Sequence, residues 1–150
     1  MIVQELLELS PLRLVTALPT TTISEAARRM ERFGIGLVVI MEEDDGIAGV
    51  LSERDVVYAL GRNEIDLEET VVGDLMTETV VTVSPNTSIV EAILAMNSNG
   101  IRHVIAAEEG KPVGVLSIRD VLRVMARQLL DNESESNEQL TTEFVEALAA

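Results

Sequence analysis

Two copies of one short motif hold the residues of this chain best suited to bind a ligand. Residues 49–56 read GVLSERDV and residues 114–121 read GVLSIRDV. Each copy places a serine hydroxyl, an arginine guanidinium and an aspartate carboxylate within four residues. A carboxylate accepts hydrogen bonds from a vicinal diol, and a serine at a helix N-terminus lies among backbone N–H groups that favour an anion. The motif therefore has the chemistry to bind a hydroxyl-bearing anion.

The same spacing also has a purely structural interpretation. Ser-x-x-Asp at the start of a helix is a capping box, worth about 1 kcal/mol, and spacing alone favours this interpretation because such motifs recur by chance. Elsewhere the chain offers Thr22-x-x-Glu25 and Ser88-x-x-Glu91, which cap with glutamate. Both copies of the motif keep the shorter aspartate together with arginine and glycine, and capping alone does not require that. Both interpretations stay open at this point.

The duplication extends well beyond the motif. Residues 14–19 align with 80–85 at an offset of 66, and this offset holds as far as Gly34 and Gly100. At the motif the offset is 65, so the intervening loops differ by one residue. The chain is a tandem repeat. Because neither half is long enough to bury a sizeable core alone, we expect the halves to pack as one domain.

The first half predicts the order strand, helix, strand, strand, helix. We expect strands at 14–17, 37–41 and 47–51, and helices at 23–33 and from Ser52 to Gly61. The first helix has a capping box at Thr22 and Glu25 and ends at Gly34. Its spacing predicts a buried face of Ile23, Ala26, Ala27, Met30 and Phe33, with Arg28, Arg29, Glu31 and Arg32 in water.

The second half predicts the same order. Its expected strands are 80–83, 104–107 and 113–116, and its expected helices are 89–96, ending at Asn99-Gly100, and 118–130. Residues 64–70 form a polar linker between the halves. Residues 1–10 are predicted to form a short docking helix. Residues 131–138 have the composition of a disordered spacer, and Leu140, Phe144 and Leu148 lie on one face of a further short helix.

Composition restricts the classes of function. The chain has 150 residues, 47% of them hydrophobic, and no cysteine, which excludes disulfides and Cys-based zinc or redox sites. A net charge of −15 repels nucleic acid and anionic lipid, so neither is an expected partner. Without a signal peptide or a membrane-spanning stretch, the default location is the cytoplasm. The acidic run 42–45 lacks the spacing of a calcium loop and predicts a solvated turn rather than a metal site.

Two strand-helix-strand-strand-helix units, each with Gly-x-x-Ser-x-Arg-Asp at its last strand-to-helix junction, resemble a cystathionine beta-synthase (CBS) domain pair, or Bateman module. The resemblance covers about residues 11–130. It implies an α+β fold of two pseudo-twofold-related repeats, about 11–62 and 77–130, in one domain over 1–130. The charge of the last twenty residues, which contain acids and no basic residue, predicts an acidic tail at 131–150. The resemblance also implies adenosine-containing ligands in two clefts between the repeats, regulation rather than catalysis, and frequent homodimers.

The resemblance assigns roles to individual residues. It gives Asp55 and Asp120 the ribose hydroxyls, and Ser52 and Ser117 the phosphate. Contacts to adenine are implied from apolar side chains and backbone of the opposite half. That places Thr21, Val115 and Leu37 in one cleft and Thr87, Val50 and Ile101 in the other.

The two halves differ where basic side chains are expected. The mid-repeat glycine is followed by Ile35-Gly36-Leu37 in the first half and by Ile101-Arg102-His103 in the second. In the family this strand start often supplies cations to the ligand phosphates. The resemblance therefore implies that the cleft with Arg102 and His103 holds phosphate better than its pseudo-symmetric mate. His103 has an alternative role as a partly buried strand histidine bonded to backbone. Arg54 and Arg119 either face the phosphates or pair with nearby acids such as Glu53 or Glu108.

The leading hypothesis is a regulatory module that binds an adenine nucleotide and acts on a dimer or a protein partner. With so few cations, AMP, ADP or S-adenosylmethionine is favoured over tightly held ATP, NAD is a further alternative, and no cofactor is required. The competing hypothesis is a scaffold that binds no nucleotide. An enzyme is disfavoured, because no catalytic spacing, Gly-rich phosphate loop or metal cluster is evident.

The segments that precede the two repeats are expected to differ. Residues 72–77, VGDLMT, resemble the lead-in of the family, whereas residues 6–11, LLELSP, do not. These segments correspond at the offset of 66, so the first half is predicted to be more divergent in function.

Overall fold

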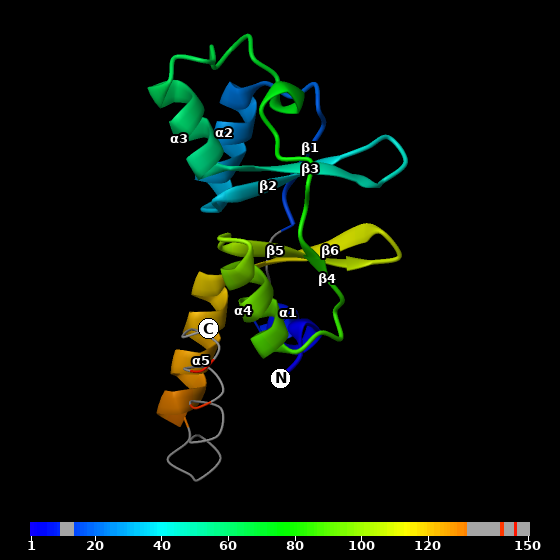
Figure 1. The fold of residues 1–150 in the computed structure, drawn as a ribbon, viewed down its shortest axis with the longest axis vertical. Helices are drawn as coiled ribbons and strands as arrows, with labels where there is room; N and C mark the ends of the chain where they lie inside the picture. The colour runs from blue at the N-terminus through cyan, green and yellow to red at the C-terminus, as the bar shows by residue number, and fades with distance from the viewer. Residues whose placement is uncertain (10–13, 132–141, 143–145, 147–150) are drawn as a thin grey trace. The chain divides into compact units, whose positions relative to one another are not determined.

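The computed structural model describes residues 1–9, 14–131, 142 and 146, and it contains two compact units (Figure 1). The first-repeat unit comprises residues 13–80 with 109–112, and the second-repeat unit comprises 1–12, 81–108 and 113–150. Each unit combines one three-stranded sheet with helices, so the predicted α+β class is confirmed. The expected acidic spacer and the tail helix through Leu140, Phe144 and Leu148 lie outside the described residues.

The first-repeat unit has the predicted order of elements. It contains β1 (Thr16–Ala17), α2 (Ile23–Phe33), β2 (Leu37–Met41), β3 (Ile47–Ser52), α3 (Glu53–Gly61) and a 3₁₀ turn, η1 (Val72–Asp74). The sheet order is β1-β2-β3, with β1 parallel to β2 and β3 antiparallel to β2, as the expected hairpin requires. The strand β1 is shorter than predicted and begins at Thr16 rather than at residue 14.

The second-repeat unit repeats this arrangement. It contains β4 (Thr82–Val83), α4 (Ile89–Ser98), β5 (His103–Glu108), β6 (Lys111–Ser117) and α5 (Ile118–Asp131), in the sheet order β4-β5-β6. The N-terminal helix α1 (Val3–Leu9) belongs to this unit and contacts α5.

The helix α2 begins and ends where its sequence predicts, but some of its side chains make contacts that its sequence does not predict. Thr22 caps its first turn and Gly34 ends it at φ 61°, the left-handed conformation that glycine adopts without strain. The reciprocal half of the predicted capping box is absent, because the Glu25 carboxylate accepts a hydrogen bond from Arg29. Arg29 is not fully in water, since it also donates to the carbonyl oxygen of Thr16. Phe33, predicted to be buried, is 36% exposed.

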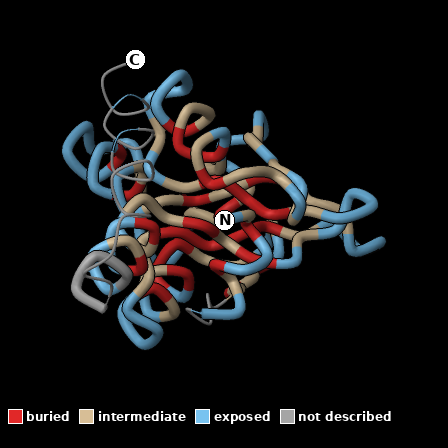
Figure 2. The backbone as a smooth tube through the Cα atoms, turned by 90° about the horizontal axis from the view of Figure 1, so that it is seen from below, coloured by how far each residue is buried: buried red, intermediate tan, exposed pale blue. Residues whose placement is uncertain are grey.

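Each unit has its own hydrophobic core. In the first-repeat unit Ile23, Val38, Ile40, Leu51 and Val72 are fully buried. In the second-repeat unit the fully buried side chains include Val3, Leu6, Val121 and Leu116. The residues at the hairpin turns 42–45 and 108–111 are exposed, as the pale blue segments of Figure 2 illustrate. The alternation of buried strands and solvated turns follows the alternation of apolar and acidic runs in the sequence.

The two lead-in segments make equivalent backbone contacts, which corrects one sequence prediction. The amides of Val3 and Gln4 donate to the carbonyl oxygens of Thr87 and Pro85, both at 2.9 Å. The amides of Val72 and Gly73 donate to Thr21 and Pro19 at 2.7 and 2.8 Å. Residues 72–77 therefore correspond to residues 3–8. The repeat offset of 66 had paired them with residues 6–11, which lie three residues later in the sequence. The apparent divergence of the first lead-in came from this shift in register, so it gives no reason to expect a divergent function.

Each lead-in also covers the glycine that begins a motif. A Cβ atom on Gly49 would lie 2.8 Å from the carbonyl oxygen of Thr77 and 3.0 Å from the sulfur of Met76. On Gly114 it would lie 2.8 Å from Cδ2 of Leu7. The motif glycines are thus explained by close packing of the lead-in segments against β3 and β6, before any ligand is considered.

Candidate ligand site

The first copy of the motif forms a complete capping box at the start of α3. The Ser52 hydroxyl accepts a hydrogen bond from the amide of Asp55 at 3.2 Å and donates to Asp55 Oδ2 at 2.7 Å. The Ser52 amide donates to the same oxygen at 2.8 Å. Among the described residues, these bonds leave Oδ1 of the half-buried carboxylate available as an acceptor. Arg54 is exposed one residue earlier.

The second copy forms two of these three serine–aspartate contacts at the start of α5. The amide of Asp120 donates to the Ser117 hydroxyl at 3.2 Å, and that hydroxyl donates to Asp120 Oδ2. Here Oδ1 accepts a hydrogen bond from Arg123 at 3.0 Å. The Asp120 side chain is 16% exposed, whereas Arg119 is exposed. The predicted capping is therefore present in both copies, and it leaves the ligand-binding interpretation open.

One backbone hydrogen bond joins each motif to the start of the central strand in its own unit. The amide of Glu53, the first residue of α3, donates to the carbonyl oxygen of Gly36 at 3.0 Å. The amide of Ile118, the first residue of α5, donates to Arg102 at 3.0 Å. In the first-repeat unit, Ser52 also pairs directly with Leu37 across the sheet. The predicted phosphate-binding strand starts therefore lie beside the serine–aspartate boxes within each unit.

This junction carries opposite charge in the two units. In the first-repeat unit the Glu53 carboxylate covers Gly36, where a Cβ atom would meet its carboxyl carbon at 3.2 Å. In the second-repeat unit the corresponding residues are Ile118 and Arg102, followed by the half-buried His103 at the start of β5. A guanidinium favours a nearby phosphate and a carboxylate disfavours it. The sequence analysis identified Arg102 and His103 but missed Glu53 as the opposing charge.

The two predicted threonines occupy equivalent turns. The Thr21 hydroxyl accepts a hydrogen bond from the amide of Leu18, and the Thr87 hydroxyl accepts one from Ser84, each at 3.1 Å. Their carbonyl oxygens accept the lead-in hydrogen bonds described above. The lead-ins therefore fix the backbone of both threonines, a role that sequence analysis missed because of the shifted register.

The two predicted valines are half-buried strand residues. Val50 in β3 forms a two-way backbone pairing with Thr77, at 3.0 and 2.9 Å, and Val115 lies in β6. Thr21 and Val50 belong to the first-repeat unit, and Thr87 and Val115 to the second. Each predicted cleft group draws on both units, and its assembly stays a prediction.

Membrane-spanning helices and metal-binding clusters are two further features for which the described residues give an answer. Within that part of the chain, no helix is long and apolar enough to cross a membrane. The same residues contain no group of three or more His, Asp or Glu side chains placed to hold a metal ion.

Comparison with known proteins identifies the family. The family model described as CBS domain matches the chain twice, over residues 8–62 and 72–127. The chain belongs to the CBS-domain family. The two matches confirm the resemblance inferred from the duplicated motif.

Two curated proteins are similar to this CBS pair over most of its length. A functionally uncharacterized protein of Methanopyrus kandleri is 35% identical over 73% of this chain and 57% of its own length. A 17.7 kDa protein of Acidianus ambivalens is 37% identical over 75% of this chain and 65% of its own length. The chain thus spans less than two thirds of the length of these curated relatives.

Solved CBS structures share the fold. A CBS-domain protein of Agrobacterium tumefaciens superposes with a TM-score of 0.77 at 31% identity, covering 83% of this chain and 98% of that one. A CBS-domain protein of Pyrobaculum aerophilum, crystallised in complex with AMP, superposes with a TM-score of 0.74 at 30% identity. That match covers 88% of this chain and 100% of the other. A CBS pair that resembles this chain at 30% identity therefore binds AMP.

Proposed function

We propose that this CBS pair is a regulatory module that binds an adenosine-containing ligand, with AMP as the first candidate. The observation that carries the proposal is the position of Arg102 beside the Ser117–Asp120 box, joined to it by the Ile118–Arg102 hydrogen bond of 3.0 Å. This backbone bond places Arg102 at the same strand-to-helix junction as Ser117 and Asp120. The AMP complex of the relative from Pyrobaculum aerophilum supports the choice of ligand.

The proposed roles follow from the chemistry of each group. Asp55 and Asp120 accept hydrogen bonds from the ribose hydroxyls, and Ser52 and Ser117 lie at helix N-termini that favour the phosphate. Arg102 and His103 add positive charge in the second-repeat unit, while Glu53 opposes an anion in the first. Arg54 and Arg119 are exposed beside the boxes and offer long-range attraction. We infer that a ligand with one or two phosphates binds near Arg102 in preference to ATP.

The proposed action is regulatory rather than catalytic. A ligand changes the conformation of a protein only through unequal affinity for two states. The lead-in segments 3–8 and 72–77 bond to the backbone of Thr87 and Thr21, both proposed ligand residues. A ligand that shifts either threonine would therefore move a lead-in, and a protein partner or a second copy would respond to that movement.

A homodimer is part of the proposal. The helix α3 exposes Val57 at 62%, Tyr58 at 56% and Leu60 at 42%. Adjacent apolar side chains on one helix are a common feature of contacts between copies. The variant Val57→Glu should shift the molar mass measured by light scattering from dimer to monomer, whereas Val113→Glu, on the 45%-exposed Val113 of β6, should leave it unchanged. A monomeric wild-type protein would remove the dimer from the proposal.

Thermal unfolding with AMP, ADP, ATP, adenosine, S-adenosylmethionine and NAD tests the function. At 100 times its dissociation constant a ligand adds about 2.7 kcal/mol, which raises the midpoint by about 5–10 °C for a chain of this size. The variants Asp55→Ala and Asp120→Ala identify the working site. Asp55→Glu and Asp120→Glu provide the matched controls, because Ser88–Glu91 forms the same capping box with glutamate.

The outcomes separate ligand binding from capping. If the aspartates bind ribose, the glutamate variants keep the midpoint of the free protein but lose most of the shift with AMP. If the aspartates serve only as caps, the glutamate variants keep both the midpoint of the free protein and the shift with AMP. If none of the six compounds shifts the midpoint, the proposed function is overturned. The scaffold hypothesis, in which the protein retains the fold and binds no nucleotide, then remains.

A further inference from the structure

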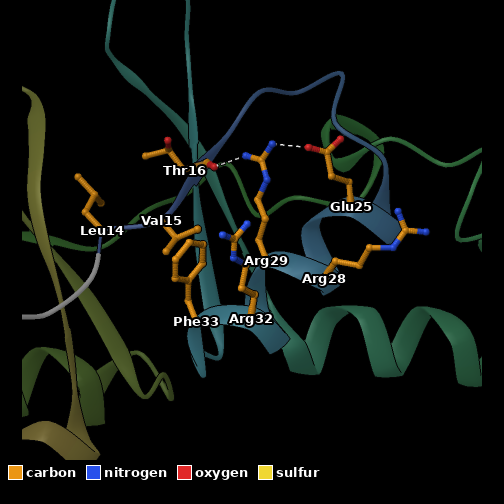
Figure 3. A pocket seen from close by; sticks show the side chains of 8 residues that line it. All are labelled: Leu14, Val15, Thr16, Glu25, Arg28, Arg29, Arg32 and Phe33. Atoms are coloured by element: carbon orange, nitrogen blue, oxygen red, sulfur yellow. Dashed lines mark hydrogen bonds and ion pairs between the residues drawn. The ribbon is translucent and has the colours of Figure 1, made fainter.

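The first-repeat unit contains a hollow between α2 and β1 that the nucleotide proposal does not use. Its volume is about 710 Å³, and its lining combines Leu14, Val15 and Phe33 with the arginines of α2 (Figure 3). Among the described residues, the lining includes no member of either Ser-x-Arg-Asp motif. A hollow of this size accommodates a small organic molecule.

The hollow concentrates positive charge in an acidic protein. The chain has a net charge of −15 and only 11 basic residues, yet Arg28, Arg29 and Arg32 line this hollow against a single acid, Glu25. Arg28 extends away from the other two in Figure 3, and its guanidinium lies 3.5 Å from Glu68. The lining remains positive with Arg29 and Arg32 alone, because Glu25 balances only one of them.

Arg29 and Arg32 each contact another residue of the lining. Arg29 donates one hydrogen bond to the carbonyl oxygen of Thr16 and another to Glu25, and its side chain is 34% exposed. A guanidinium has five N–H donors, so these two bonds leave others for a ligand. The guanidinium carbon of Arg32 lies 5.6 Å from the centroid of the Phe33 ring, within the range of a cation–π contact. Figure 3 shows both side chains directed from α2 toward β1, beside Val15 and Phe33.

We propose that this hollow binds a small organic anion with an aromatic or apolar body and a phosphate or carboxylate group. Arg29 and Arg32 line the same hollow, and an oxyanion that reaches both guanidinium groups gains charge-assisted hydrogen bonds. The body of the ligand contacts Leu14, Val15 and the exposed edge of Phe33. The site is independent of the nucleotide proposal, because the two share no residue.

The chain provides a direct probe of this site. It contains two phenylalanines, Phe33 and Phe144. Protein labelled with 4-fluorophenylalanine gives two fluorine signals in NMR, and the variant Phe33→Leu assigns them. Titration with 1-naphthyl phosphate should move the Phe33 signal in a saturable way. The neutral analogue 1-naphthol should produce at most a small, unsaturated shift.

Matched arginine variants decide whether the charge is responsible. Arg32→Gln should weaken binding at least about tenfold, the equivalent of one charge-assisted hydrogen bond. Arg28→Gln removes another charge from α2, but the Arg28 side chain extends toward Glu68. This variant should therefore change the affinity for 1-naphthyl phosphate by less than about twofold. Arg32→Lys keeps a charge and should recover part of the loss. Saturable binding that is equal in Arg32→Gln and wild type, or the absence of a Phe33 shift, would overturn the proposal.

Asp120→Ala separates the two sites. If 1-naphthyl phosphate binds the hollow, this variant titrates like the wild type with it, while its affinity for AMP falls. If its affinity falls along with that for AMP, 1-naphthyl phosphate occupies the nucleotide site, and the hollow is not a binding site. Because Arg32 is exposed, Arg32→Gln should keep the unfolding midpoint, which confirms that the variant is folded.

Discussion

The amide of Ile118 donates a 3.0 Å hydrogen bond to the carbonyl oxygen of Arg102. This bond joins the first residue of α5 to the residue that precedes β5. The equivalent bond between Glu53 and Gly36 has the same length, and the Glu53 carboxylate lies against Gly36, the residue that corresponds to Arg102. One fold thus presents the same junction with opposite charge in its two repeats.

This difference predicts that phosphate binding depends on Arg102. Arg102→Gln should weaken AMP binding by about 10- to 100-fold, the value of one or two charge-assisted hydrogen bonds, while adenosine binding changes by less than about twofold. Isothermal titration calorimetry of both ligands provides the measurement. Arg62→Gln is the control, since exposed Arg62 belongs to the first-repeat unit and its guanidinium lies 4.0 Å from the Glu64 carboxylate. An equal loss for AMP and adenosine would indicate a general disturbance of β5 instead.

The converse change tests the role of Glu53. Glu53→Gln removes the carboxylate above Gly36 and should improve AMP affinity at the first-repeat unit by about 2- to 10-fold, the effect of one like charge near the anion. Titration in an Asp120→Ala background isolates this unit from the other. Unchanged affinity there would show that the Glu53 carboxylate does not face the phosphate.

The two motif glycines should respond differently to one added methyl group. In Gly49→Ala the new Cβ would lie 2.8 Å from the backbone oxygen of Thr77, which cannot move without breaking its pairing with Val50. In Gly114→Ala it would meet the end of the Leu7 side chain, which can change rotamer. We expect urea unfolding to show a loss of about 1–3 kcal/mol for Gly49→Ala and less than about 1 kcal/mol for Gly114→Ala. Equal losses would contradict this explanation of the glycines.

Much of the fold follows from local sequence signals. Apolar runs bounded by acidic turns predicted the hairpin strands, and helix caps with glycine stops predicted α2 and α4 within two residues. These signals depend only on residues that are close in the sequence, so they can be recognised without knowledge of tertiary contacts. The boundaries of β1 did not follow, because only two of its residues pair with β2 and that pairing depends on a distant strand.

The errors concern contacts between distant segments. Arg29 was expected in water, but Thr16 offers it a carbonyl oxygen that the helical pattern does not reveal. The lead-in register was wrong because the connections to the two repeats differ by three residues, which only the hydrogen bonds of Val3 and Val72 show. At the candidate site the motif predicted Ser52 and Asp55 correctly as neighbours, whereas the position of Glu53 over Gly36 required the structure.

The lead-in helix α1 should contribute to the stability of the second-repeat unit. Leu6 is fully buried in its core, whereas Leu9 on the same helix is 59% exposed. Leu6→Ala should cost about 2–5 kcal/mol through lost burial and a new cavity, and Leu9→Ala less than about 0.5 kcal/mol. Urea denaturation followed by circular dichroism measures both values. Similar small losses in both variants would show that α1 is not an integral part of the unit.

The capping box of α4 predicts a specific dependence of stability on pH. The hydrogen bond from the Ser88 hydroxyl, together with one from its backbone amide, lowers the pKa of the Glu91 carboxyl below its ordinary value of 4.5. A depressed pKa stabilises the folded state above the unfolded pKa, and this contribution is lost as the pH falls through the folded pKa.

The unfolding midpoint of the wild type minus that of Glu91→Gln should therefore stay constant above about pH 5.5 and shrink as the pH falls below about 4.5. Ser88→Ala removes the hydroxyl and should weaken this dependence while leaving the carboxylate in place. Thermal scans between about pH 7 and pH 3 provide the measurement. A difference that stays constant over the whole range would show that the Ser88 hydrogen bonds do not favour the ionised carboxylate, and the capping box of α4 would then be a neutral contact.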